Sequence, residues 1–195
     1  MDYPLQLSFK IVALAPQIYV RDAAGQVRMY VKQKMFKLKE AVTVFADENK
    51  SEALYHINAD RVIDWSAAYN FTTAAGQAIG AVKRQGRRSL WRATYVIRDA
   101  EDQPVFTIRE ANPWSKVGDA LFGEIPVVGL LAGYVFHPVY NVLRTDGTTA
   151  LRVSKRAAFF EGRYDIEKLQ DVTPQEEGLA VLSVLMMLLL ERRRG

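Results

Sequence analysis

The most restrictive feature of this sequence is an apolar stretch close to its C-terminal end. From Leu179 to Leu190 only Ser183 is polar, so a helix over these residues has no hydrophilic face. A helix that is apolar on all sides must be buried, either in protein or in lipid. Its apolar part would be about 18 Å long at 1.5 Å per residue, against a hydrocarbon thickness of roughly 30 Å. We therefore predict a core helix, which the rest of the chain must surround.

The residues before the apolar stretch have the composition of a helix start. Thr173 suits the N-cap, Pro174 suits the first helical position, and Glu176 completes a Thr-x-x-Glu capping box. Acidic residues at this end and arginines at the other both match the helix dipole. The predicted helix spans about 174–192.

Length and composition exclude several classes of protein. A chain of 195 residues suits a single domain over 1–195, with a core of useful size. It contains no cysteine, which excludes disulfides, thiolate metal sites and cysteine catalysis. No signal-peptide pattern is present at the start, and we expect a cytoplasmic location. The net charge of +4 permits an anionic partner, but on charge alone we favour a surface that serves solubility.

The first half of the chain alternates apolar and polar residues in short runs, which favours half-buried antiparallel strands. The clearest runs are Leu7–Ile11, Tyr55–Asn58, Tyr69–Thr72 and Phe106–Arg109. Turn compositions separate paired runs, at Asp22–Gly25, Asp47–Lys50, Ala74–Gly76 and Asp99–Asp102. Similar units begin at Tyr19, Tyr69, Tyr95 and Tyr140, with a half-unit at Tyr164. This spacing predicts a repeated hairpin and about ten to twelve strands.

Many strands and one apolar helix leave few architectures. A sandwich core is too thin to hold a helix, whereas a large closed barrel can enclose one and has no exposed edges. We predict a mainly β protein, a closed antiparallel barrel of about twelve strands around a buried hydrophobic C-terminal helix. Large side chains such as Met186 and Met187 should fill its interior and leave little space for a small-molecule cavity.

One segment, at about 111–139, interrupts the repeat. A short helix is predicted from Pro113 to Phe122, followed by an apolar run that contains glycines. This run suits a buried strand or loop that closes one barrel end, or a surface loop that dips into a bilayer. The residues available for contact with a membrane or a partner are Val127, Val128, Leu130, Leu131 and Phe136.

Several motifs together resemble the LURP-one-related proteins, which are grouped with the Tubby C-terminal domain and the phospholipid scramblases. They are Tyr30-Val31-Lys32-Gln33-Lys34-Met35-Phe36, hairpins that close on Lys-Arg or Lys-Gln-Lys, Tyr164-Asp165-Ile166, and the final apolar helix. The resemblance covers about Val27 to Leu190. It implies a twelve-stranded barrel around a hydrophobic helix, a fold that binds phosphoinositides in Tubby and is linked to calcium and lipid translocation in scramblases.

The sequence also departs from these relatives. The cysteine cluster that scramblases use for acylation is absent, no run matches their calcium-binding segment, and the Gly118–Pro138 insert is longer than in compact bacterial members. Scramblase-like translocation is therefore the least supported function that the resemblance implies.

The sequence contains no recognisable catalytic constellation. His56 and His137 lie far apart, and no nucleophile elbow, phosphate-binding loop or dinucleotide fingerprint is present. We expect no enzyme activity, no metal and no cofactor.

The strongest functional signal is a basic segment with a tryptophan inside it. It carries five cations and no acid: Lys83, Arg84, Arg87, Arg88 and Arg92, with Trp91 among them. Such a cluster attracts anionic lipid headgroups, and the tryptophan suits the interfacial level. The same segment also suits an exposed turn with Trp91 directed into the barrel. Nucleic acid ranks third as a partner.

Two functions from different classes follow. The first is a non-enzymatic module that recognises anionic membrane phospholipid through the basic hairpin, peripheral at the inner membrane surface. The second is a protein-interaction or structural module that uses the apolar 123–136 insert.

Overall fold

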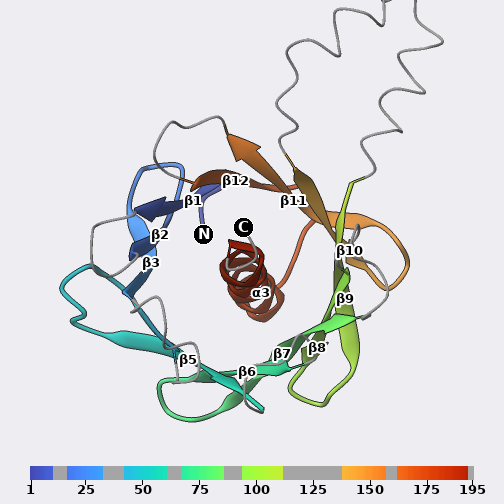
Figure 1. Cartoon of the computed structure of the whole chain (residues 1–195), viewed down its shortest axis with the longest axis horizontal. Coiled ribbons are helices and arrows are strands. Elements are labelled where there is room, and N and C mark those ends of the chain that lie inside the picture. The colour runs from blue at the N-terminus through green and yellow to red at the C-terminus, as the bar shows by residue number, and fades with distance from the viewer. Residues whose placement is uncertain are drawn as a thin grey trace, which may run out of the picture.

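In the part of the chain that the structure describes, twelve strands form a closed barrel around the C-terminal helix, as predicted (Figure 1). The computed structural model describes residues 1–10, 17–32, 42–60, 67–85, 94–111, 138–156 and 162–192. The elements are β1 (Leu5–Lys10), β2 (Gln17–Arg21), β3 (Val27–Lys32), β4 (Val42–Phe45), β5 (Ala53–Ala59), β6 (Ala68–Thr73), β7 (Ala78–Gln85), β8 (Thr94–Asp99), β9 (Pro104–Glu110), β10 (Val139–Arg144), β11 (Thr149–Arg156), β12 (Gly162–Lys168) and α3 (Pro174–Arg192).

Each strand pairs antiparallel with its neighbours in sequence, and β1 pairs with β12 to close the ring. In β1, Leu5, Leu7 and Phe9 are buried, whereas Gln6 is exposed. This period of two is the alternation that the sequence shows, with apolar side chains toward the barrel interior. Closure leaves no free edge, because every strand has a partner on both sides.

The interior of the barrel is occupied by α3. Every residue from Leu179 to Leu188 is at most 3% exposed. The polar member of this stretch, Ser183, is also fully buried, and its hydroxyl donates to the backbone oxygen of Leu179 at 2.7 Å. The side chain therefore satisfies its donor within the helix and needs no partner from the wall. The predicted core helix is confirmed, with the predicted bounds.

The helix comes closest to β7, β8 and β6. A glycine in β7 permits this approach: Gly80 has φ +149°, and a Cβ there would lie 2.9 Å from a methyl group of Leu179 and 2.2 Å from the backbone oxygen of Arg98. Only a residue without a side chain fits between β8 and the helix at this point.

The predicted hairpin repeat is confirmed by its backbone geometry. Four turns share one hydrogen-bond pattern, which starts from the residue at the end of the first strand or just after it. The backbone N–H of that residue donates to the carbonyl four residues later, and its carbonyl accepts from the N–H three residues later. The starting residues, each with its acceptor and its donor, are Asp22 (Gln26, Gly25), Thr73 (Gln77, Gly76), Asp99 (Gln103, Asp102) and Arg144 (Thr148, Gly147). The residue three positions after the starting residue has positive φ in each turn, which explains why it is a glycine in three turns and an aspartate in the fourth. A register shift accompanies each hairpin, as expected for a bulge after a tight turn.

The interrupting segment at about 111–139 falls between β9 and β10. Its predicted helix and its apolar run lie in 112–137, outside the described residues.

Candidate functional site

Antiparallel order places successive connections alternately at the two ends of the barrel. One end, here termed the turn rim, carries the five tight hairpin turns and the start of α3. The opposite end, termed the loop rim, carries the other strand ends and the end of α3. The contact from the Tyr95 hydroxyl near the start of β8 to Glu191 Oε1, at 2.6 Å, fixes the C-terminal end of the helix there.

The turn rim is acidic, and several of its carboxylates accept hydrogen bonds from the backbone of their own turns. Asp22 accepts from the backbone N–H of Gln26 at 2.9 Å, and Asp146 accepts from the N–H of Thr148 at 2.8 Å. Burial alone would raise the pKa of Asp22, but bonds from Arg28 and from the Gln26 N–H hold it below its usual value. The acids at this rim are Asp2, Asp22, Asp47, Glu48, Glu52, Asp99, Glu101, Asp102, Asp146, Asp171, Glu176 and Glu177.

Four arginines at the turn rim are held in ion pairs, whereas its lysines Lys50 and Lys168 lie over the rings of Phe45 and Tyr3. Arg28 binds Asp22 at 2.6 Å, and three further pairs join Arg21 to Glu48, Arg98 to Asp102 and Arg144 to Glu176. This rim is acidic even though it includes arginines, because each of these arginines is paired with a carboxylate and further carboxylates remain.

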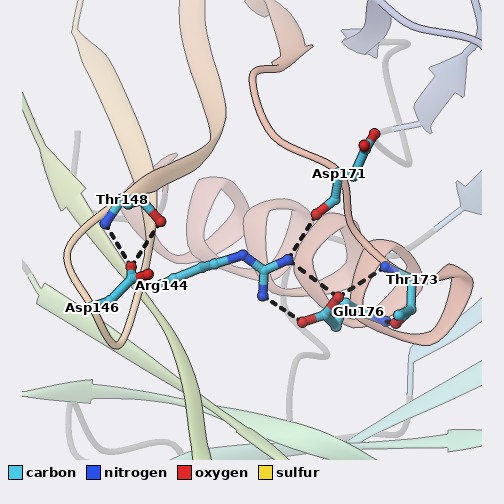
Figure 2. Close-up of polar contacts among 6 residues, drawn as sticks. All are labelled: Arg144, Asp146, Thr148, Asp171, Thr173 and Glu176. Atoms are coloured by element: carbon cyan, nitrogen blue, oxygen red, sulfur yellow. Dashed lines mark hydrogen bonds and ion pairs between the residues drawn. The ribbon is translucent and has the colours of Figure 1, made fainter.

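The start of α3 is fixed to the barrel wall at the turn rim (Figure 2). Arg144 donates to both carboxylate oxygens of Glu176, at 2.7 and 3.3 Å, and to the backbone oxygen of Asp171 at 2.8 Å. Glu176 also accepts from the Thr173 N–H at 2.8 Å, and the Thr173 hydroxyl accepts from the Glu176 N–H at 3.2 Å. The predicted capping box is thus confirmed. A second acid, Glu177, faces the N-terminal ammonium group at 3.0 Å.

The loop rim is basic. Its described cations are Lys10, Lys32, Lys83, Arg84, Arg109, Lys155, Arg156, Arg163 and Arg192, against the acids Asp60, Glu110, Asp165 and Glu191. Cross-strand register brings some of the cations together, since Arg156 lies directly opposite Arg163. Like charges in this position repel one another, and an ion pair with Asp165 offsets the charge of Arg156.

The lysines of this rim differ from the arginines of the turn rim. Lys32, Lys83 and Lys155 are exposed, and within the described part of the chain none of them forms an ion pair. Their charge is therefore available to an external anion.

Of the six residues predicted for lipid binding, two can be placed. Lys83 is exposed near the end of β7, and Arg84 is half-buried on the opposite face of the same strand, opposite Tyr95 in the register. The structure thus presents Lys83 to solvent and directs Arg84 toward the barrel interior. Arg87, Arg88, Trp91 and Arg92 lie in 86–93, and the five apolar contact residues lie in 112–137, both outside the described residues.

Sequence reasoning did not predict a tyrosine cluster around the end of α3. Besides Tyr95, which donates to Glu191, Tyr140 and Tyr164 sit close enough to Glu191 to feel its charge. Burial, followed by Glu110 and Glu191, raises the pKa of Tyr140. Burial also raises the pKa of Tyr164, although Arg192 opposes this. Tyr140 and Tyr164 therefore stay neutral at physiological pH. The sequence feature that could have indicated this cluster is the tyrosine that begins each repeat unit.

Metal chemistry finds no support in the described residues. The Nδ1 atom of His56 lies 3.3 Å from the Thr43 hydroxyl, so this histidine is hydrogen-bonded locally. Across the described ranges no group of three or more histidines and carboxylates is placed to hold a metal ion. Among the helices in these ranges, none is long and apolar enough to cross a membrane.

Part of the chain matches the model of a known family. Residues 27–117 match the family model described as LURP-one-related. Over these residues the chain is similar to the LURP-one-related proteins. The match starts at Val27, as the resemblance predicted, and includes Lys83 to Arg92, whereas the predicted resemblance continued to Leu190. No curated protein and no solved structure gave a match.

The LURP-one-related match supports a binding module in general terms. The family is not known as a family of enzymes. The match names no ligand, so the ligand must be argued from the surface of the barrel.

Proposed function

We propose that this protein is a non-enzymatic binding module that docks on anionic membrane phospholipid through its loop rim. The observation that carries the proposal is topological. The second strands of three hairpins, β3, β7 and β11, run into the basic patches Lys32-Gln33-Lys34, Lys83-Arg84 and Lys155-Arg156. Antiparallel order brings the ends of these strands to one rim.

The centre of the proposed site is the segment after β7. Lys83, Arg87, Arg88 and Arg92 supply charge, and Trp91 supplies an aromatic ring suited to the headgroup level. Each Lys or Arg near an anionic surface contributes about 1 kcal/mol, so a few such contacts give measurable binding. Arg84 belongs to the same segment, and because it is half-buried we expect it to contribute less to headgroup contact than Lys83.

Vesicle flotation tests this function. The protein should float with phosphatidylcholine vesicles that contain phosphatidylglycerol or a phosphoinositide and should not float with phosphatidylcholine alone. Binding should weaken as salt rises, because exposed charges are screened within about 8 Å at physiological ionic strength. The double variant Arg87→Glu/Arg88→Glu should bind weakly, and unchanged flotation of this variant would remove the assigned site.

A second candidate function is a protein-interaction module that uses the apolar residues 123–136. The supporting observation is that this segment lies between the end of β9 and the start of β10, both of which are at the loop rim. Val127, Val128, Leu130, Leu131 and Phe136 would form the contact. A pull-down with and without residues 123–136 separates the two functions. The protein-interaction function predicts that the deletion abolishes partner binding and that the protein does not bind lipid vesicles.

For either function we propose a cytoplasmic protein, which for lipid binding would be peripheral at the inner membrane surface. Binding of this kind needs no catalytic residue, metal or cofactor.

A further inference from the structure

We infer that the membrane contact is the whole loop rim rather than one hairpin, and that the barrel stands upright on an anionic bilayer with its turn rim directed away. This inference rests on the proposed lipid binding and specifies its geometry. It makes the partner an extended anionic surface instead of a single phosphate group.

The spacing of the unpaired lysines is the first argument. In the closed strand order, β3, β7 and β11 are separated from one another by three intervening strands on every side. Lys32, Lys83 and Lys155 lie at or near the loop-rim ends of these strands, so they divide the rim into thirds. Adjacent strands are about 4.8 Å apart, which puts neighbouring lysines roughly 19 Å apart along the wall.

That separation decides the kind of partner. It exceeds the screening length of about 8 Å at physiological ionic strength, so a small anion beside one lysine is scarcely attracted by the other two. A flat anionic surface meets all three at once. Because each is exposed and free of ion pairs in the described structure, no carboxylate must be displaced first.

The opposite rim supplies the second argument. Its carboxylates cap their own turns and pair with its arginines, and they outnumber its cations, so this rim is acidic. An anionic bilayer therefore repels one end of the barrel and attracts the other. The modest net charge of +4 conceals this separation of charge along the barrel axis. An orientation with the loop rim down brings the basic end of the barrel to the bilayer and keeps the acidic end away from it.

Three single charge reversals test the inference, with one matched control. Lys32→Glu, Lys83→Glu and Lys155→Glu each change an exposed lysine at a different third of the loop rim. Lys168→Glu changes an exposed lysine at the far end of β12, near the turn rim. The affinity of each variant for phosphatidylcholine vesicles with phosphatidylglycerol is compared with that of the unaltered chain, after circular dichroism has shown that the fold is intact.

We expect each rim variant to bind about tenfold more weakly, since each reversal removes one attraction and adds one repulsion, while Lys168→Glu binds as before. Loss confined to Lys83→Glu would overturn the rim inference and leave the proposed function in place. An equal loss in Lys168→Glu would overturn the upright orientation. If inorganic phosphate at low concentration displaced the protein from vesicles, the inference of an extended surface would be overturned in favour of a site for a single anion. If the unaltered chain binds no vesicle, the proposed function and this inference both fall.

Discussion

Arg144 on β10 and Glu176 in the first turn of α3 form a two-point ion pair, with N–O distances of 2.7 and 3.3 Å, that joins the barrel wall to the helix inside it. Both side chains are about one quarter exposed, so the pair is only partly screened by water. The same carboxylate caps the helix through the Thr173 N–H. One acidic side chain thus sets both where the helix starts and where it sits against the wall.

The pair gives the stability of the fold a defined dependence on pH. The hydrogen bond from Arg144, opposed by burial and supported by the Thr173 N–H, lowers the pKa of Glu176 below its ordinary value of 4.5. A carboxylate with a lowered pKa stabilises the fold fully above pH 4.5, and this contribution is lost as the pH falls through the lower folded-state pKa. Glu176→Gln should therefore cost about 1 to 2 kcal/mol at neutral pH and progressively less in acid.

Denaturant unfolding of both chains between pH 7 and pH 3 measures this difference. Arg98→Gln serves as a control, because the pair of Arg98 with Asp102 is exposed and should contribute little. A cost of Glu176→Gln that stayed constant across the pH range would contradict the assigned role.

The helix core offers a contrast between two neighbouring positions. Leu185 is fully buried in an apolar surrounding, so Leu185→Ala should cost about 3 kcal/mol. Ser183 is equally buried, but its hydroxyl bonds only to the Leu179 carbonyl, which the helix backbone also satisfies. Ser183→Ala should therefore change the unfolding free energy by less than about 1 kcal/mol. Equal losses in the two variants would show that the serine has a role that its contacts do not reveal.

Gly80 is the position at which the wall tolerates no side chain. In Gly80→Ala the new Cβ would approach the Arg98 backbone oxygen to 2.2 Å, and backbone cannot move aside as a side-chain tip can. We expect a loss of about 2 kcal/mol or more from overpacking and backbone strain. Gly76→Ala is the matched control, since its φ of +84° is also positive but nothing lies within 4 Å of its Cβ; it should cost about 1 kcal/mol. Thermal unfolding ranks the two, and the reverse order would contradict tight packing between β8 and the helix.

The helix and the barrel could be predicted from the sequence because the strongest physical requirement is local. An apolar run such as Leu179–Leu190 must be buried, and the period-two strands and repeated turns show what buries it. Gly80 could not be singled out, because its reason is the distant backbone of Arg98, which only the tertiary structure brings near.

The candidate site was predicted less completely, for a related reason. A cluster that is contiguous in sequence, Lys83–Arg92, is visible without a structure. The equal spacing of Lys32, Lys83 and Lys155 depends on barrel closure, and their freedom from ion pairs depends on which carboxylates lie at the other rim. Alternation along β7 likewise separates Lys83 from Arg84, although the two are adjacent in the sequence.

The orientation of the barrel on a membrane can be measured directly, because the chain contains no cysteine and accepts a single one cleanly. Gln85→Cys and Gln77→Cys place a label at opposite ends of β7: Gln85 is its last residue, Gln77 precedes its first, and both are exposed. Each variant is labelled with a polarity-sensitive fluorophore and titrated with phosphatidylcholine vesicles that contain phosphatidylglycerol. We predict a blue shift of the emission for the label at residue 85 and none for the label at residue 77. A shift at residue 77, or equal shifts at both positions, would contradict docking through the loop rim.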